Sequence, residues 1–482
     1  MSNMTMILVA PVLVASLACS PGNLVSNSPL PPGVPDPTGT HNPAGAAALY
    51  VGALVKSRTA FGGDANSFVP VTGLMTDELR STDIGLIGSS SAPMAIDSRI
   101  MPEYPGGGQT DNITPSPIGQ LYSILQRARG QISEARGALH AYAPATPPAL
   151  YGHLDALEGY ADLMLAEAFC SGIPLSTLDF NQNYTLKPGS TTQHVYETAI
   201  TLFDSALAIS SDSDRILNLA RVGKGRALLA FGQYADAAAA VSLVPDDYRY
   251  AWDFNTAVSG STTSPFENLN FAFFAFNPGG PLTMVDQEGG NGPPFLSSGD
   301  PRSAWAQYGE NLHHLPEFRP LKYDQSGDSA IVMASGIEAR LIKAEYEVDA
   351  GASTWINTLN ALRTDGTYTT QPDPVDPTRT DTLWNPGTGH VAGLRPLTDP
   401  GSPDARVALV FTERAYWLFL TGHRQGDLRR LVRQYGRAPD QVYPTGPYPG
   451  GHGLYGNDVT APIPGDERIS NPLFHGCLSR GA

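Results

Sequence analysis

The sequence predicts a mostly α-helical protein in which paired helices form a scaffold and one long, loop-rich insertion interrupts them. Apolar residues recur at three- and four-residue steps over several segments that contain few helix breakers. The chain also has 50 glycines and 42 prolines, which indicates long irregular connections. With 482 residues, 41% of them hydrophobic and 16% charged, it can bury a large core as one broad domain or two subdomains.

Near the N-terminus lies an apolar stretch, MILVAPVLVASLAC, that runs from Met6 to Cys19. It is shorter than the roughly 20 residues of a membrane-spanning helix and fits the hydrophobic region of a signal peptide. Because Cys19 follows Ser-Leu-Ala, the site resembles a bacterial lipobox, in which this cysteine becomes the lipidated first residue. We expect a signal peptide over residues 1–18 and a lipid anchor with a Pro-rich tether over residues 19–45. The alternative is an ordinary signal peptide with an incidental cysteine.

The cysteine count adds a second expectation. The chain has three cysteines, Cys19, Cys170 and Cys477. If Cys19 carries lipid, two cysteines remain in an oxidising compartment, which predicts a disulfide between Cys170 and Cys477. Two unrelated buried thiols are the alternative.

Residues 46–244 show successive helical periods and are interpreted as a helical-repeat part. The predicted helices are Ala46–Thr59, Ser116–Tyr142, Leu150–Gly172, Thr192–Ile209, Leu217–Phe231 and Asp236–Ser242. One pair contains small and aromatic residues at the spacing of a tetratricopeptide repeat, where small side chains let two antiparallel helices approach closely. These positions are Gly225, Gly232, Tyr234 and Ala237.

Residues 245–330 differ in composition from what precedes them. Gly, Pro, Asn and aromatic residues dominate, and FAFFAFN, Phe271–Asn277, is the only convincing strand. Long loops on a helical scaffold often carry function. We therefore interpret this segment as an insertion that presents ligand.

Helical periods resume in residues 331–482 and include the aromatic run FTERAYWLFLTGHRQGDLRRLVRQYGR. Its charged candidates are Glu413, Arg414, Arg424, Asp427 and Arg430. They are either catalytic groups or a paired network that locks a helix into the core. Glu413 and Arg424 would share a face after about three turns, unless the helix ends at Gly422. Because breaking a buried ion pair costs about 3–5 kcal/mol, we favour the structural network.

These C-terminal segments are similar to the SusD/RagB family. ARLIKAEYEVDAGASTWINTLNALR resembles a paired-helix segment of that family, and the charged run resembles its ER…G-R--DL-R helix. The residues similar to the closing PIP--E---NP signature are Pro462, Ile463, Pro464, Glu467, Asn471 and Pro472. The resemblance implies a SusD-like α/α superhelix. It also implies a lipoprotein at the cell surface, anchored in the outer membrane, that binds an oligosaccharide or other oligomeric nutrient. Such a protein delivers its ligand to a SusC-like TonB-dependent transporter and is not an enzyme.

The insertion offers side chains suited to a sugar. Aromatic rings pack on the C–H faces of sugars, while amide and guanidinium groups hydrogen-bond to their hydroxyls. The ligand-binding candidates on this chemistry are Tyr250, Trp252, Trp305, Tyr308, Asn311, Phe318 and Arg319. Trp305 and Tyr308 would lie on one side of any short helix there. The alternative is that these rings pack beneath the loops as a local core.

Other functional classes have less support in the sequence. The net charge of −16 argues against nucleic acid as a partner, because phosphates need a basic surface. The sequence contains no GxxxxGK[ST], HExxH, CxxC or GxSxG motif, so it indicates no catalytic residues, metal site or cofactor. Membrane contact is expected through the lipid anchor only. A helical-toroid glycosidase or lyase and a structural surface protein are the alternatives.

Overall fold

The computed structural model describes most of the chain after residue 40. The described ranges are 41–82, 92–101, 117–180, 183–254, 270–276, 280–310, 314–323, 327–364, 369–372, 380–383, 394–449 and 453–482. The expected signal peptide, Cys19 and all but the last residues of the tether therefore lie outside the described residues. Within those ranges, no helix combines the length and apolar character that a membrane crossing requires.

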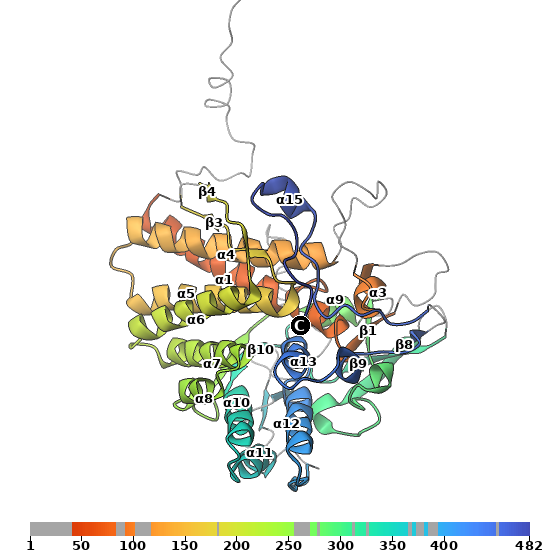
Figure 1. The fold of residues 1–482 in the computed structure, drawn as a ribbon. Helices are drawn as coiled ribbons and strands as arrows, with labels where there is room; N and C mark the ends of the chain where they lie inside the picture. Colours follow the sequence, from red (N-terminus) through yellow and green to blue (C-terminus); the bar gives the residue numbers. More distant parts are fainter. Residues whose placement is uncertain are drawn as a thin grey trace, which may run out of the picture.

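The helices of the N-terminal part are α1 (Pro43–Gly62), α2 (Phe68–Leu74), α3 (Ala92–Asp97), α4 (Pro117–Tyr142), α5 (Pro148–Ala168), α6 (Thr192–Ile209), α7 (Asp214–Phe231) and α8 (Tyr234–Val241). Figure 1 shows α1 and α4 to α8 as a layered stack, with α3 on the other side of the molecule. Local sequence fixes where several of them begin. Asn42 and Thr191 cap α1 and α6 by accepting hydrogen bonds from the backbone N–H groups of Gly45 and His194. The helix predicted from Ala46 thus begins three residues earlier.

The repeat-like pair α7–α8 packs as closely as its small residues suggest. A Cβ on Gly225 would lie 2.5 Å from Cγ1 of Val241, so a larger residue there would push the two helices apart. Gly232 ends α7 with a left-handed φ of 85°, which a glycine adopts without steric cost. Tyr234 opens α8 and donates a hydrogen bond to Gln434, 3.1 Å away, which joins the pair to the C-terminal part.

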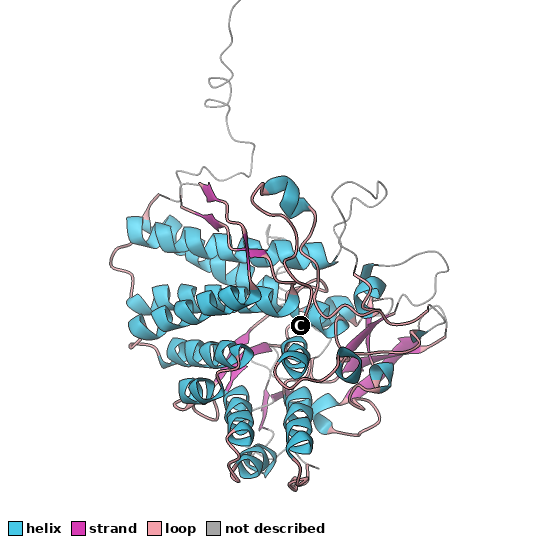
Figure 2. Ribbon diagram, viewed as in Figure 1, coloured by secondary structure: helices cyan, strands magenta, loops and turns pink. Residues whose placement is uncertain are grey.

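The remaining helices belong mainly to the C-terminal half. They are α9 (Phe271–Ala275), α10 (Gly336–Asp349), α11 (Trp355–Thr364), α12 (Pro403–Trp417), α13 (Arg424–Arg433), α14 (Pro439–Val442) and α15 (Asp466–Ser470), with 3₁₀ turns η5 (Glu288–Gly290) and η6 (Pro301–Ser303). Figure 2 shows that helices dominate and that strands occur as short, separate ribbons. The mostly α-helical prediction is confirmed.

The strands in the described residues form isolated antiparallel pairs. They are β1 (Leu79–Ser81) with β7 (Leu282–Met284), β2 (Ile173–Pro174) with β5 (Gly189–Ser190), β3 (Thr177–Leu178) with β4 (Tyr184–Thr185), β6 (Arg249–Trp252) with β10 (Ile331–Ser335), β8 (Trp305–Glu310) with β9 (Pro316–Pro320), and β11 (Thr369–Pro372) with β12 (Thr380–Leu383). Two of these pairs, β1–β7 and β6–β10, join segments far apart in the sequence and so attach loops to the helical scaffold.

The strand predicted at FAFFAFN is wrong, because this segment forms helix α9. Phe271, Ala272, Ala275 and Phe276 are all buried, and that spacing follows one face of a helix rather than the alternation of a strand. The ring of Phe271 packs edge-on against Tyr323 at 5.3 Å. A short apolar run of this kind fits either structure, and the tertiary contacts decide it.

Helix α5 forms the centre of the core, since nearly all of it is buried. Its buried charges have partners on neighbouring helices. Asp162 accepts a hydrogen bond from Nε of Arg129 on α4 at 2.6 Å, and Glu167 accepts one from Nε of Arg226 on α7 at 2.9 Å. These pairs fix the order of α4, α5 and α7 within the apolar core.

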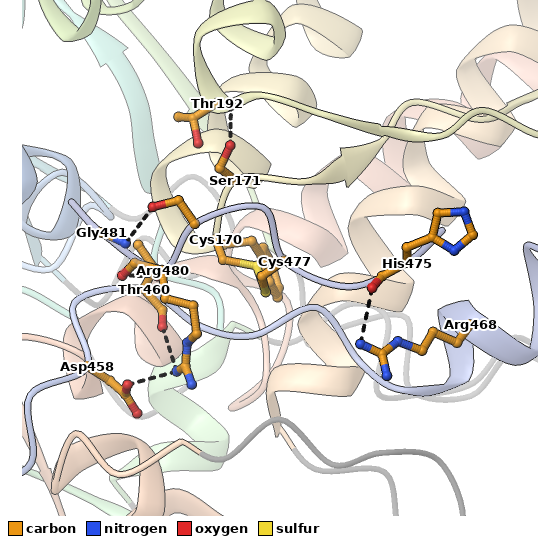
Figure 3. The surroundings of a disulfide bond; sticks show 12 residues. Cys170, Ser171, Thr192, Asp458, Thr460, Arg468, His475, Cys477, Arg480 and Gly481 are labelled. Carbon is orange, nitrogen blue, oxygen red and sulfur yellow. Dashed lines mark hydrogen bonds and ion pairs between the residues drawn. A yellow bond between two sulfur atoms is a disulfide. The ribbon is translucent and has the colours of Figure 1, made fainter. Parts of the chain in front are cut away.

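A disulfide ties the end of α5 to the C-terminal tail (Figure 3). Cys170 and Cys477 are bonded across 307 residues of sequence, which is the pairing that the cysteine count predicts. Backbone bridges flank the bond on both sides, joining Phe169 to Ala461 and Ser171 to Ser479. The tail is therefore held to the helical core as an extra strand-like segment.

We predict that Cys170→Ser lowers the free energy of unfolding by about 4–5 kcal/mol, because the bond closes a very long loop in the unfolded chain. Urea unfolding of the oxidised variant measures the loss. Cys477→Ser and the double variant serve as controls and should lose the same amount. Equal stability of wild type and variants would contradict the prediction.

Candidate functional site

The charged run at the C-terminus folds as two helices rather than one. Helix α12 ends at Trp417, and α13 begins at Arg424. Gly422 between them has a φ of 74°, and a Cβ there would lie 2.7 Å from the ring of Phe68. Both the backbone conformation and the close packing require glycine at this position. Glu413 and Arg424 therefore lie on different helices.

The five charged candidates of this run are all buried, and they pair with one another and with distant segments. Arg414 binds Asp427 with two hydrogen bonds of 2.8 and 2.9 Å. Arg430 donates to the same carboxylate at 2.9 Å and also pairs with Glu345 on α10. Arg424 binds Asp77, which follows α2, with a hydrogen bond of 2.7 Å from its Nε. The arrangement is a structural network that joins α10, α12, α13 and the N-terminal part.

The carboxylate of Glu413 is the point where three segments meet. It accepts hydrogen bonds from Arg302 at 2.8 Å, from Arg363 at 2.5 Å and from Nε1 of Trp417 at 3.0 Å. The Arg302 guanidinium also lies 5.0 Å from the ring centre of Tyr416 and 4.9 Å from that of Trp417. Sequence reasoning missed Arg302 because its partner lies 111 residues away.

The loop around Arg302 fixes the position of Trp305. Asp300 caps turn η6 and binds the Arg302 side chain with hydrogen bonds of 2.9 and 2.7 Å. Ser303 Oγ donates to the Phe295 carbonyl at 2.7 Å, and Trp305 Nε1 donates to the Leu296 carbonyl at 2.9 Å. The indole is therefore anchored through its N–H to a loop that the buried Glu413 holds in place.

Trp305 opens the β8–β9 hairpin, and its side chain is 39% exposed. Gln307 lies opposite Phe318 in the register, and the ring of Phe318 meets the indole edge-on at 4.9 Å. Trp305, Gln307 and Phe318 thus share one face of the hairpin, which we call the Trp305 face. Tyr308 sits at a register shift and donates its hydroxyl to the Leu282 carbonyl of β7 at 2.8 Å.

The prediction that Trp305 and Tyr308 share one side of a helix is therefore wrong, since both lie in a bulged strand. Arg319 pairs in register with Ala306, so the alternation of the strand places it on the face opposite the Trp305 face. Asn311 lies outside the described residues.

The prediction that Tyr250 and Trp252 bind ligand is also corrected, because both side chains are buried in strand β6. Tyr250 is 1% exposed, and its hydroxyl lies 2.8 Å from Nε2 of His153 on α5. Trp252 is 7% exposed, and its indole N–H points at the sulfur of Met333 at 3.2 Å. These two rings form part of the core beneath the loops, so they do not contact a ligand at the surface.

Two buried carboxylates, which the sequence did not single out, hold together loops on the same side of the molecule as Trp305. Asp97 at the end of α3 accepts a hydrogen bond from the Tyr448 hydroxyl at 2.6 Å, and Glu288 accepts one from Tyr455. Burial raises the pKa of both carboxyls. They hold Tyr448 and Tyr455 against α3 and η5, respectively. Nothing in the local sequence distinguishes these carboxylates from exposed ones.

Among the described residues, no group of three or more His, Cys, Asp or Glu side chains could hold a metal ion. The described charges of the network and of the carboxylate pair all serve buried contacts. What this side offers to a ligand is the Trp305 face, an exposed ring with a neighbouring amide.

Comparison with known proteins gives the fold a name. No protein-family model matches the sequence, and no curated protein matches it. Solved structures match over almost the whole chain. A SusD homolog from Bacteroides thetaiotaomicron has a TM-score of 0.61 at 12% identity, and covers 92% of this chain and 99% of its own. The chain has a SusD-like fold.

Two further structural matches carry names that describe binding. A "laminarin binding SusD-like protein" has a TM-score of 0.59 at 14% identity, and covers 91% of this chain and 99% of its own. A "surface glycan-binding protein A" from Bacteroides uniformis has a TM-score of 0.58 at 13% identity, and covers 90% of this chain and 98% of its own. The resemblance to SusD seen in the C-terminal motifs is thus confirmed at the level of the fold.

We predict that Glu413→Gln lowers the free energy of unfolding by about 3–5 kcal/mol, because two buried arginines lose their shared counter-charge. Urea unfolding measures the loss. The variant should also make Trp305 more accessible to iodide, which quenches tryptophan fluorescence. The contribution of Trp305 is the part of the quenching that is lost when Trp305→Phe is introduced into the same protein. Asp399→Asn breaks an exposed ion pair with Arg406 and is the control, with little expected change. Unchanged stability and quenching in Glu413→Gln would refute the role assigned to this carboxylate.

The environment of the Asp427 carboxyl leads us to predict that the stability of the fold depends on pH. Burial alone would raise the pKa of this carboxyl, but Arg414 and Arg430 hold it well below its usual range. Because the pKa is depressed in the folded state, the stabilisation is present above the unfolded pKa of about 4 and is lost as pH falls below it. The stability difference between wild type and Asp427→Asn should therefore shrink between pH 7 and pH 3. A constant difference across urea titrations at these pH values would show that the charge of Asp427 is not what stabilises the fold.

Proposed function

We propose that this protein binds an oligosaccharide or a similar oligomeric nutrient at the Trp305 face and delivers it to a SusC-like TonB-dependent transporter. The observation that carries the proposal is the exposed, anchored indole of Trp305 on the loop-rich side of a SusD-like fold. Figure 1 places the β8–β9 hairpin on the side of the molecule opposite α6 to α8.

The Trp305 face has the chemistry that a sugar requires. The indole offers an apolar ring for sugar C–H groups, and the Gln307 amide beside it offers both a hydrogen-bond donor and an acceptor. The hydrogen bond to the Leu296 carbonyl and the contact with Phe318 already restrict the ring, so little rotamer entropy is lost when a ligand binds. The names of the two glycan-related structural matches support the same ligand class for this chain.

We further propose that the protein binds its ligand without cleaving it. A glycosidase needs two carboxyl groups that flank the scissile bond. Among the described carboxyl groups on this side, Glu413, Asp97 and Glu288 are buried and hydrogen-bonded within the protein. Glu310 at the end of β8 is exposed and lies 3.5 Å from Nδ1 of His314, so it is the first carboxylate to substitute in the test below. Incubation of purified protein with candidate glycans tests this point, because release of shorter chains that a single carboxylate substitution abolishes would identify an enzyme instead.

The proposal also places the protein at the cell surface, anchored through lipid on Cys19. The Cys170–Cys477 disulfide supports an oxidising compartment. Mass spectrometry of protein from native membranes should find acylated Cys19, whereas an unmodified Cys19 would exclude the anchor. Co-purification from detergent-solubilised membranes should recover the transporter.

We predict that Trp305→Ala weakens glycan binding by about thirtyfold or more, as removal of a central aromatic contact does at other interfaces. A panel of soluble glycans that includes laminarin identifies a ligand, and calorimetry then gives the affinity. Tyr184→Ala is the matched control, because Tyr184 is 71% exposed and its strand, β4, lies at another side of the molecule from β8 in Figure 1. Unfolding curves check that both variants remain folded. If Trp305→Ala binds every glycan like wild type but assembles differently, the protein is a structural surface protein.

A further inference from the structure

Two segments that are distant in sequence lie at one end of the molecule, and each carries exposed apolar side chains. Tyr184 and Leu186, in and just after β4, are 71% and 36% exposed, and Ile469 and Leu473, in and just after α15, are 75% and 46% exposed. The two segments are joined by a hydrogen bond of 2.9 Å from the Asn471 amide to the Lys187 carbonyl. We call these four apolar side chains the tether-side patch. Figure 1 shows β4 and α15 at the same end, the upper one in this view.

The described chain begins at this same end. The ring of His41 stacks on Tyr142 at 5.2 Å and lies 5.2 Å from the ring of Phe180. Phe180 belongs to the turn that joins β3 to β4, so His41 packs against the hairpin that carries Tyr184. The proposed lipid anchor, Cys19, precedes His41 by 22 residues of Pro-rich sequence.

We propose that the tether-side patch rests in the headgroup region of the membrane that holds the lipid on Cys19, as a second and weak contact. This inference depends on the lipid anchor of the proposed function and adds a protein surface to it. An extended tether of this length reaches at most about 75 Å, so the patch stays within reach of the bilayer. Because the tether keeps the patch close to the bilayer, the effective concentration of membrane around the patch is high. A patch–membrane contact that would be too weak without the anchor can therefore form.

The composition of the patch fits a lipid surface better than a protein partner. Tyrosine, leucine and isoleucine are side chains that bury in the interfacial zone, and tyrosine keeps its hydroxyl in water. Lys187 and Arg468 are exposed sequence neighbours of the patch and can face anionic headgroups, while the exposed Asp466 at the start of α15 opposes them. Four side chains cover far less than the roughly 800 Å² that each partner contributes to a stable protein interface. A lipid contact that a covalent anchor assists needs no such area.

Hydrogen exchange on the full acylated protein tests the proposal. The protein is compared in detergent and in vesicles of phosphatidylethanolamine and phosphatidylglycerol. We expect several-fold slower exchange of the amides around 183–187 and 466–474 in vesicles. The double variant Tyr184→Glu, Ile469→Glu should lose this protection while it still sediments with the vesicles through its lipid. Leu454→Glu, at a 65% exposed leucine in the 446–455 segment, should keep it.

The outcomes separate this proposal from the proposed function. Sedimentation of wild type with vesicles but no protection of the patch would overturn the membrane contact and leave the anchor intact. Protection of the patch that requires added transporter would assign the patch to a protein partner. Protection that occurs in Cys19→Ser protein without vesicles would assign it to contacts within or between copies of the chain itself. Failure to sediment would refute the anchor together with the contact. Glycan affinity of the double variant should equal that of wild type in every case.

Discussion

The buried carboxylate of Glu413 is the constraint on which the ligand side of this molecule depends. A carboxylate with 2% exposure is tolerated only when hydrogen bonds and opposite charges replace the water that it loses. Arg302 and Arg363 supply those charges from 111 and 50 residues away in sequence, respectively. Satisfying one charge therefore brings a surface loop, α11 and α12 to one point, and the position of Trp305 follows from it.

The sequence predicts the helical scaffold well, since long amphipathic segments carry their own signal. Each predicted helix within residues 117–244 exists, with ends displaced by only a few residues. The short segments are where prediction fails. Phe271–Ala275 and the strand that begins at Trp305 are too short for periodicity to separate helix from strand, and contacts with distant residues decide them.

The sequence predicts the kind of side chains in the candidate site, but not which of the aromatic residues belong to it. Tyr250, Trp252 and Trp305 all belong to the same aromatic-rich insertion, and nothing in their local sequence separates them. Pairing of β6 with β10 buries the first two, while an anchored loop leaves the third exposed. A loop-rich layer of this size needs its own core, so some of its rings must pack inward. Exposure, which sequence spacing does not encode, decides which ring is available to a ligand.

The same logic explains why the charged run is rich in arginine. Asp427 receives two arginines and Glu413 receives two more. A planar guanidinium can hold both oxygens of a carboxylate, as Arg414 does with Asp427, and a lysine could not. The paired side chains bring α10, α11, α12, α13 and the loop of Arg302 together as one unit. Fold stability and the position of Trp305 are then linked, because a change that loosens this unit also frees the loop that anchors the indole. If Trp305 binds ligand as proposed, the charges contribute by fixing the ring in place and need not touch the ligand.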